Sequence, residues 1–262
     1  MKIASWNINS VRARLPRFIE YLEKGRPDVL CVQELKCQEH EFPTEEVQAA
    51  GYLAALHGQK TYNGVAILTR QELGPATEVV KGLSDDEDDA HARLIAGTVG
   101  GIRILSVYAP NGQEVGSEAY VYKLRWYQRL RRYLDTRQRK DQPLIVTGDF
   151  NVAPSPIDVH DPGLWEGQTL CSQPEREALA ELMAFGLTDT YRLKNPETQA
   201  FSWWDYRQLS FPKNKGLRID HVLVSAPLLP RLTEAGIERE FRKGKQPSDH
   251  APVFVQLGPS LD

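Results

Sequence analysis

Short apolar runs of strand length recur along the chain, and most of them end in glycine or in polar residues. The run from Leu144 to Val146 follows Pro143 and ends at Gly148, and its β-branched side chains are typical of a buried strand. Runs of the same kind predict further strands. These are expected at residues 2–7, 29–33, 53–57, 65–69, 77–80, 94–99, 102–108, 187–191, 219–225 and 253–257.

Longer segments between several of these strands have a helical character. Ser10 can cap a helix that runs to about Lys24, before Pro27, and Gly51 can end a short helix. The segment that starts at Ser117 is long and strongly basic, with apolar residues on one side. Helices are therefore expected at residues 10–24, 43–50, 117–139 and 174–185.

Strands alternate with helices in the first part of the chain, whereas the later strands follow one another more closely. Gly100 and Gly101 join one pair at a hairpin-like spacing. This mixture predicts an α/β fold with mixed rather than purely parallel sheets. The chain has 262 residues, of which 41% are hydrophobic and 26% charged, so we expect one large domain over residues 1–262.

Charge and cysteine content exclude few classes of function. The formal net charge is -3, so overall charge alone does not indicate a protein that binds nucleic acid. The 3 cysteines form no Cys-x-x-Cys motif, which argues against a disulfide framework and a zinc site. No segment is typical of a secretion signal or a membrane span, so we expect a cytoplasmic protein without membrane partners.

Polar residues with potential chemistry follow or precede the apolar runs. In α/β folds the ends of strands open into a crevice where side chains from several strands converge. Each residue alone is more simply explained as a turn, a cap or a hydrogen-bonded structural group. Several carboxylates together would repel one another unless a cation or a proton network joined them. The residues are Asn7, Glu34, Tyr108, Asp149, Asn151, Asp220, His221, Asp249 and His250.

A hard divalent cation would resolve this repulsion. Carboxylate and amide oxygens without thiolates suit Mg²⁺, with Mn²⁺ as a possible substitute. Mg²⁺ commonly uses few protein carboxylates and completes its shell with phosphate oxygens of the substrate. The cluster therefore indicates a phosphate ester as the substrate.

Five motifs in order along the chain resemble the signatures of the endonuclease/exonuclease/phosphatase superfamily. The segment Phe201-Ser202-Trp203-Trp204-Asp205-Tyr206-Arg207 and the spacing narrow the resemblance to the exonuclease III family of apurinic/apyrimidinic endonucleases. Each motif is weak alone, but five in order over nearly the whole chain are specific. The motifs are Trp6-Asn7-Ile8-Asn9, Gln33-Glu34, Gly148-Asp149-Phe150-Asn151, Arg218-Ile219-Asp220-His221 and Ser248-Asp249-His250-Ala251-Pro252.

The resemblance implies a four-layered α/β sandwich, in which two mixed β-sheets pack face to face with helices on the outside. It also implies Mg²⁺-dependent hydrolysis of phosphodiester bonds in double-stranded DNA, 5′ to abasic sites and at blocked 3′ ends, by a monomer. The balance between these activities depends on loops that contact the duplex, and residues 158–170 are the candidates here.

The resemblance also assigns roles at the site. Glu34 is expected to be the main metal ligand, with Asn7 beside it and Asp249 as a further ligand. Asp149 activates or orients the attacking water, and Asn151 holds the scissile phosphate.

Three further residues complete the expected catalytic set. His250 stabilises the developing charge on the phosphate, and Asp249 orients the ring of His250. Asp220 supports the site or a second metal position. Tyr108 lies near the phosphate as a hydrogen-bond donor or an acid for the leaving group.

The DNA-contacting residues are harder to predict. Lys60 and Tyr62 are candidates for the backbone and the groove, and Trp203 is a candidate for the pocket of a flipped-out abasic sugar, because apolar enclosure suits a sugar without a base. Lys123 and Arg218 are expected to contact phosphates. The remaining cations of the basic helix are expected to form a solvated exterior rather than a DNA-binding face.

Three alternatives stay open at this stage. The first is a 3′-end-processing enzyme with little abasic endonuclease activity. The second is a phosphoesterase of the same superfamily that acts on a lipid, an inositol phosphate or RNA. The third is a non-catalytic DNA-binding or scaffold protein. The presence of Glu34, Asp149 and His250 counts against it, because such a protein would be expected to lack residues of this kind.

Overall fold

The computed structural model describes residues 1–85, 87 and 89–259, which form two mixed six-stranded sheets. In the first sheet the strand order is β11-β12-β1-β2-β4-β3. Strands β1 and β2 run parallel, and the other neighbours are antiparallel. The strands are β1 (Lys2–Asn7), β2 (Val29–Gln33), β3 (Tyr52–His57), β4 (Val65–Arg70), β11 (Leu232–Ile237) and β12 (Val253–Leu257).

The second sheet has the order β5-β6-β7-β8-β10-β9. Here β7 and β8 form the parallel pair, and the other neighbours are antiparallel. The strands are β5 (Thr77–Lys81), β6 (Leu94–Val99), β7 (Ile102–Tyr108), β8 (Leu144–Asp149), β9 (Leu187–Asp189) and β10 (Asp220–Ser225).

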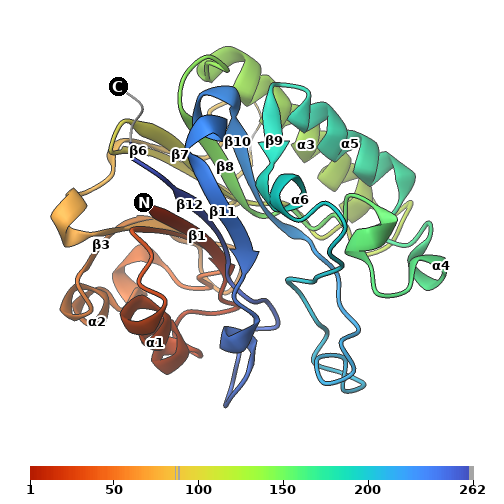
Figure 1. Ribbon diagram of the computed structural model, residues 1–262, viewed down its shortest axis with the longest axis horizontal. Helices are drawn as coiled ribbons and strands as arrows, with labels where there is room; N and C mark the ends of the chain where they lie inside the picture. The colour runs from red at the N-terminus through yellow and green to blue at the C-terminus, as the bar shows by residue number, and fades with distance from the viewer. Residues whose placement is uncertain (86, 88, 260–262) are drawn as a thin grey trace.

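The two sheets pack face to face, and helices cover their outer faces (Figure 1). α1 and α2 lie outside the first sheet, and α3 and α5 lie outside the second. This is the four-layered sandwich that the resemblance implied, so the predicted fold class is confirmed. The helices are α1 (Leu15–Lys24), α2 (Thr44–Ala49), α3 (Glu118–Arg137), α4 (Pro162–Trp165), α5 (Gln173–Met183) and α6 (Thr190–Lys194).

Alternation along the strands divides the apolar side chains among three core layers. In β8, Ile145 points between the sheets, whereas Leu144 and Val146 point toward α3 and α5. In β1, Ile3 joins the layer between the sheets, and Trp6 joins the layer beneath α1. Because successive strand residues face opposite sides and both sides are covered, these strands read as continuous apolar runs in the sequence.

Most predicted elements are confirmed to within a few residues, and the exceptions have local causes. The strand expected at 187–191 ends at Asp189, whose carboxylate caps the short helix α6 by accepting a hydrogen bond from the Arg192 amide at 3.2 Å. β11 was not predicted, because its sequence Leu-Thr-Glu-Ala-Gly-Ile lacks alternation. α1 begins at Leu15 rather than Ser10, which has a positive φ of 83°.

The acidic run from Asp85 to Asp89 lies against the basic helix, and its described residues bind cations of that helix. Arg129 on α3 is 4% exposed and donates to Asp85 and to Asp89 at 2.6–2.8 Å. Glu87 pairs with Arg125 on the same helix. Asp86 and Asp88 lie outside the described residues. The run therefore neutralises part of the positive charge of α3.

Two further features concern the length and character of the helices and the state of the cysteines. Among the residues that the structure describes, no helix combines the length and the apolar character needed to cross a lipid bilayer. Cys31, Cys37 and Cys171 are all free and buried.

Candidate active site

Strand ends from both sheets converge on one cluster of polar side chains. Asn7 ends β1 next to the end of β2, after which Glu34 follows. In the second sheet Asp149 is paired in register with Tyr108 on one side and with Asp220 on the other. The site therefore lies across the seam between the two sheets.

The Asn7 amide is a direct link between the sheets at this site. Its Nδ2 donates to Glu34 Oε1 at 2.8 Å and to Asp149 Oδ2 at 2.9 Å. The other oxygen of Asp149 accepts from the Asn151 backbone amide at 2.9 Å. Because Asn7 can donate two protons and accepts at its carbonyl oxygen, the bonds to both carboxylates also define which way its amide faces. Asp149 is thus held on both oxygens.

His250 is oriented by Asp220, not by Asp249 as the sequence predicted. Its Nδ1 lies 2.8 Å from Asp220 Oδ2, and its Nε2 lies 3.7 Å from Asp149 Oδ2. Ser202 also donates its hydroxyl to Asp220 Oδ2 at 2.6 Å. The prediction failed because Asp249 is the neighbour of His250 in sequence, and adjacent residues of an extended segment point to opposite sides.

Burial and the charges of neighbouring groups shift the pKa values of Asp149 and His250. Burial raises the pKa of Asp149, and the Asp220 carboxylate adds to this effect against the opposing influence of His250. Burial would lower the pKa of His250, but the carboxylates of Asp220 and Asp149 outweigh it, so that this pKa is raised. Near neutral pH the imidazole therefore carries a proton between two carboxylates, which is a group suited to an anionic phosphate oxygen.

Asp249 accepts hydrogen bonds from residues other than His250. Its Oδ1 accepts from Asn9 Nδ2 at 2.9 Å, and its Oδ2 accepts from Trp203 Nε1 at 3.0 Å. With each oxygen already bonded, Asp249 joins the rim of the cluster to the aromatic segment rather than to His250. Trp203 is only half-buried, whereas its neighbour Trp204 is fully buried in the core.

Glu34 has a cationic neighbour that the sequence reasoning missed. Lys36 Nζ lies 2.7 Å from Glu34 Oε2 and donates to Asn9 Oδ1 at 2.6 Å. The sequence held a signal for this neighbour, because polar residues two positions apart stand at or just after the ends of three strands. The pairs are Asn7 with Asn9, Glu34 with Lys36 and Asp149 with Asn151.

Asn151 adopts an uncommon backbone conformation with a positive φ of 51°. Its Nδ2 donates to the Ala109 carbonyl at 2.9 Å, and its Oδ1 accepts from Asn111 Nδ2 at 3.3 Å. A non-glycine residue holds such a conformation only when its surroundings favour it strongly. The loops after β7 and β8 are therefore locked together beside Asp149.

Two of the predicted phosphate contacts are buried in ion pairs. Lys123 has no exposed surface and pairs with Glu175. Arg218 is 1% exposed and binds Asp158 and Asp189, each at 2.7 Å. Both predictions of a phosphate contact are wrong for this structure, because a cation that is fully enclosed by carboxylates and carbonyls has no face left for a ligand.

The other predicted DNA contacts lie on the surface. Tyr62 is 68% exposed, and Lys60 is exposed in the same loop between β3 and β4. Tyr108 ends β7 beside the cluster, where burial and then the carboxylates of Glu34 and Asp149 raise its pKa well above the ordinary value. The Tyr108 hydroxyl therefore stays protonated and can act as a donor.

The donor set fits a divalent cation. One ligand atom each from Asp149, Asp220 and His250 lies within 4.8 Å of the others, and Asp220 Oδ1 is buried without a hydrogen-bond partner. Glu34 presents a carboxylate that already attracts the Lys36 ammonium. Orphaned and cation-paired carboxylate oxygens of this kind are the ligands that hard divalent metals use.

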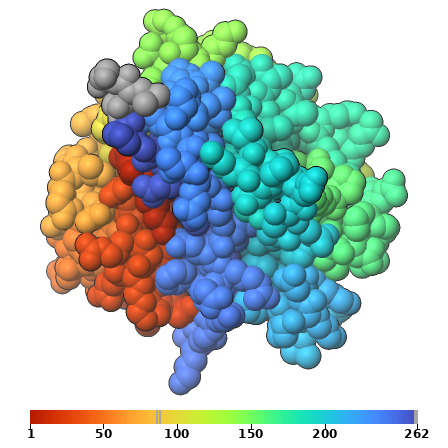
Figure 2. Space-filling model, in the orientation of Figure 1, coloured from red at the N-terminus to blue at the C-terminus, as the bar shows by residue number. Residues whose placement is uncertain are grey.

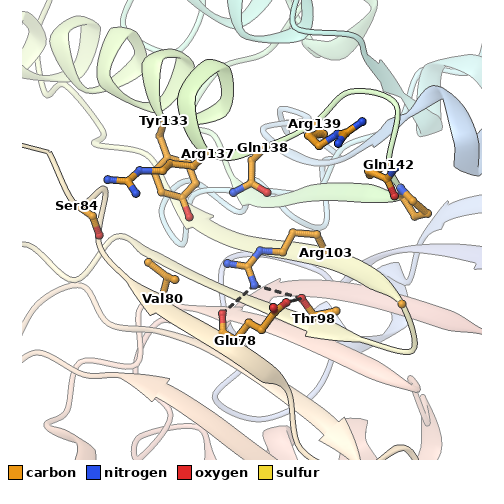
Figure 3. A pocket seen from close by; sticks show the side chains of 12 residues that line it. Glu78, Val80, Ser84, Thr98, Arg103, Tyr133, Arg137, Gln138, Arg139 and Gln142 are labelled. Atoms are coloured by element: carbon orange, nitrogen blue, oxygen red, sulfur yellow. Dashed lines mark hydrogen bonds between the residues drawn. The ribbon is translucent and has the colours of Figure 1, made fainter.

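A hollow of the surface, drawn in Figure 3, is lined by residues outside this cluster. It has a volume of about 560 Å³ and is lined by residues from β5–β7 and the end of α3. Arg103 at the start of β7 donates there to the Glu78 carbonyl at 2.8 Å. Tyr108 is at the other end of β7, so the hollow and the polar cluster lie at opposite ends of this strand. None of the predicted site residues lines it.

Two packed sheets with carboxylates, an amide and a protonated imidazole at their shared edge define a metal-dependent phosphoesterase. The sequence model of the Endonuclease/Exonuclease/phosphatase family matches residues 4–250. The chain belongs to this family, and its relatives identify it as a hydrolytic nuclease of DNA repair within the exonuclease III group.

Three similar proteins illustrate this relationship. Exodeoxyribonuclease III of Haemophilus influenzae is 36% identical over 98% of this chain and 100% of its own length. The structure of the 3′ phosphatase NExo from Neisseria, bound to a product DNA hairpin, has a TM-score of 0.94 and 39% identity, with 99% of this chain and 100% of that chain covered. An AP endonuclease from Archaeoglobus fulgidus has a TM-score of 0.93 and 34% identity, with 98% and 99% covered.

Proposed function

We propose that this nuclease uses Mg²⁺ to hydrolyse phosphodiester bonds of duplex DNA, both 5′ to abasic sites and at blocked 3′ ends, and that it acts as a monomer. The observation that carries the proposal is the Asp220–His250–Asp149 cluster, in which the imidazole of His250 lies between two buried carboxyl groups. A cytoplasmic location is part of the proposal, and the free buried cysteines support it.

Each residue of the cluster has a role in this proposal. Asp149, held by Asn7 and the Asn151 amide, orients the attacking water and accepts its proton. His250, held by Asp220, donates to a phosphate oxygen where charge develops. Glu34 is the main metal ligand, and the cation when bound neutralises charge on the phosphate.

A 3′-end-processing enzyme with little abasic endonuclease activity is the second candidate, and one packing feature favours it. Trp165 on α4 packs edge-on against Trp203, with ring centroids 6.5 Å apart. Both rings border an apolar cluster that contains Leu170 and Leu217. Because Trp203 was the expected pocket for an abasic sugar, the Trp165 ring occupies one side of the residue on which that pocket would depend.

The deciding experiment compares two labelled duplexes, one with a single abasic-site analogue and one with a recessed 3′-phosphate, each with Mg²⁺ or EDTA. Metal-dependent incision 5′ to the abasic site, together with phosphate release, is the result we expect. Phosphate release without incision would leave the second candidate. No turnover of either duplex, with turnover of an inositol phosphate or a lipid phosphodiester instead, would refute both.

A further inference from the structure

The side chains of the buried ion pair between Lys123 and Glu175 also form hydrogen bonds with backbone groups of neighbouring loops. The Lys123 ammonium is fully enclosed and also donates to the Asn111 carbonyl at 3.0 Å and to the Asn151 carbonyl at 2.6 Å. Since an ammonium has three protons, these two carbonyls and the Glu175 carboxylate use its whole capacity. One side chain of α3 thus holds the loops that follow β7 and β8.

Glu175 extends the same network to a third loop. Its carboxylate is fully buried and accepts from the Leu170 amide at 3.0 Å and from the Ser172 amide at 3.1 Å. The Ser172 hydroxyl donates to the same carboxylate at 2.6 Å and also contacts Tyr120. The segment between α4 and α5, which follows Trp165, is therefore anchored to the pair.

The contact with Asn151 links the pair to the reaction. Lys123 binds the carbonyl of Asn151, while the amide of that same residue binds Asp149 Oδ1. Asn151 also holds the left-handed conformation, which depends on external contacts. A shift of this backbone would move the amide that aims Asp149 and the side chain expected at the phosphate.

We propose that Lys123 and Glu175 are positioning residues for the reaction, which hold the Asn151 backbone and thereby aim Asp149 without touching DNA. The inference rests on the proposed hydrolysis at the Asp149 cluster. The pair acts on the rate of the chemical step, because small displacements of a reacting group reduce rate steeply while the binding surface is left intact.

The test uses Lys123→Met, Glu175→Gln and the double variant, with Arg129→Met as the matched control. Arg129 lies on the same helix and is also buried in ion pairs, but these pairs face the loop of Asp85 and Asp89. We expect Lys123→Met to lower kcat for 3′-phosphate release by about 10²-fold, with KM changed by less than about threefold. Arg129→Met should keep kcat within about twofold.

The double variant separates positioning from stability. It carries no lone buried charge, so it should unfold at a higher temperature than Lys123→Met. It still lacks both donors to the loop carbonyls, so its kcat should stay low. A double variant with kcat near the unsubstituted protein would overturn the proposal. If Lys123→Met does not fold, Glu175→Gln, which keeps shape and lysine, must lower kcat about threefold or more, and an unchanged kcat there also overturns the proposal.

DNA affinity in EDTA at several salt concentrations excludes a direct contact. Because neither residue touches DNA in the proposal, affinity and its salt slope should be unchanged in Lys123→Met. A salt slope reduced by about one would mean that Lys123 neutralises a phosphate, and would overturn the positioning role. Failure of the unsubstituted protein to hydrolyse either duplex would instead reject the proposed function itself.

Discussion

At the scale of single residues, the members of the polar cluster were predictable, and their hydrogen-bond partners were not. Asp149 and His250 stand in motifs whose order along the chain identifies them. Which carboxylate orients the imidazole depends on strand register, because Asp220 is 30 positions from His250 in sequence, whereas Asp249 is its neighbour. Motifs therefore reveal membership in the site, whereas hydrogen-bond geometry needs the fold.

The substitution Asp149→Asn tests the proposed base. It keeps the shape and removes the proton acceptor, so we expect kcat to fall by about 10²- to 10⁴-fold. DNA binding in EDTA should stay within about threefold, since the amide fills the same volume. Single-turnover rates and fluorescence anisotropy measure the two quantities, and near-normal turnover would refute the role of Asp149.

Glu34→Gln tests the proposed metal ligand. Loss of one carboxylate charge should raise the Mg²⁺ concentration for half-maximal activity by about tenfold or more, while activity at saturating Mg²⁺ recovers in part. Glu45→Gln on the exposed face of α2 is the control and should leave the titration unchanged. An identical Mg²⁺ curve for both variants would show that another residue holds the ion.

At the scale of elements, regular strands and helices followed from the pattern, and irregular segments did not. The segment between α6 and β10 has no periodicity, yet Trp203 forms bridges with both Leu217 and His250. Charged residues were misplaced for a related reason. Arg218 is enclosed by Asp158, 60 positions away, and by Asp189, 29 positions away, and no local pattern encodes such pairs.

The Asp158 network gives a pH-dependent prediction for the loop after β8. Burial opposes ionisation, but Arg218 and further partners prevail and lower the Asp158 pKa to about 2. A depressed carboxyl pKa contributes stability above about pH 4, the unfolded value, and loses it as the pH falls toward 2. This shift corresponds to about 2 kcal/mol of unfolding free energy at neutral pH.

Asp158→Asn should therefore destabilise the protein by about 2–3 kcal/mol at pH 7, because Arg218 keeps only Asp189 as its ionic partner. The difference from the unsubstituted protein should shrink between pH 4 and pH 2, measured by urea unfolding. Asp141→Asn, which removes an exposed partner of Arg139, serves as the control and should show no such trend. A constant difference at all pH values would contradict the linkage.

At the scale of the whole molecule, the resemblance predicted the architecture. The packing of the two sheets against each other brings the residues of the site together. Asn7 and Glu34 come from the first sheet, and Asp149 and Asp220 come from the second. Their relative position therefore depends on the apolar layer between the sheets rather than on any one loop.

Ile145→Ala tests that layer. The side chain is fully buried between the sheets, so the cavity should cost about 2–5 kcal/mol of unfolding free energy. The urea midpoint should fall while the slope stays constant, and Leu193→Ala, at a side chain that is 51% exposed, should change neither. A changed slope would show that the substitution also alters the surface exposed on unfolding or breaks the two-state transition.

The return of the chain at β12 has a consequence for the timing of activity during synthesis. β12 pairs with β1, and dark blue C-terminal atoms lie beside the red N-terminal ones (Figure 2). His250 immediately precedes this strand, and the Ser248 hydroxyl binds the Asn7 carbonyl at 2.6 Å. A ribosome-bound chain that has not yet released these residues has no imidazole beside Asp149. On the proposed roles, such a chain holds Asn7 and Asp149 without the imidazole, and we expect it to cleave no DNA.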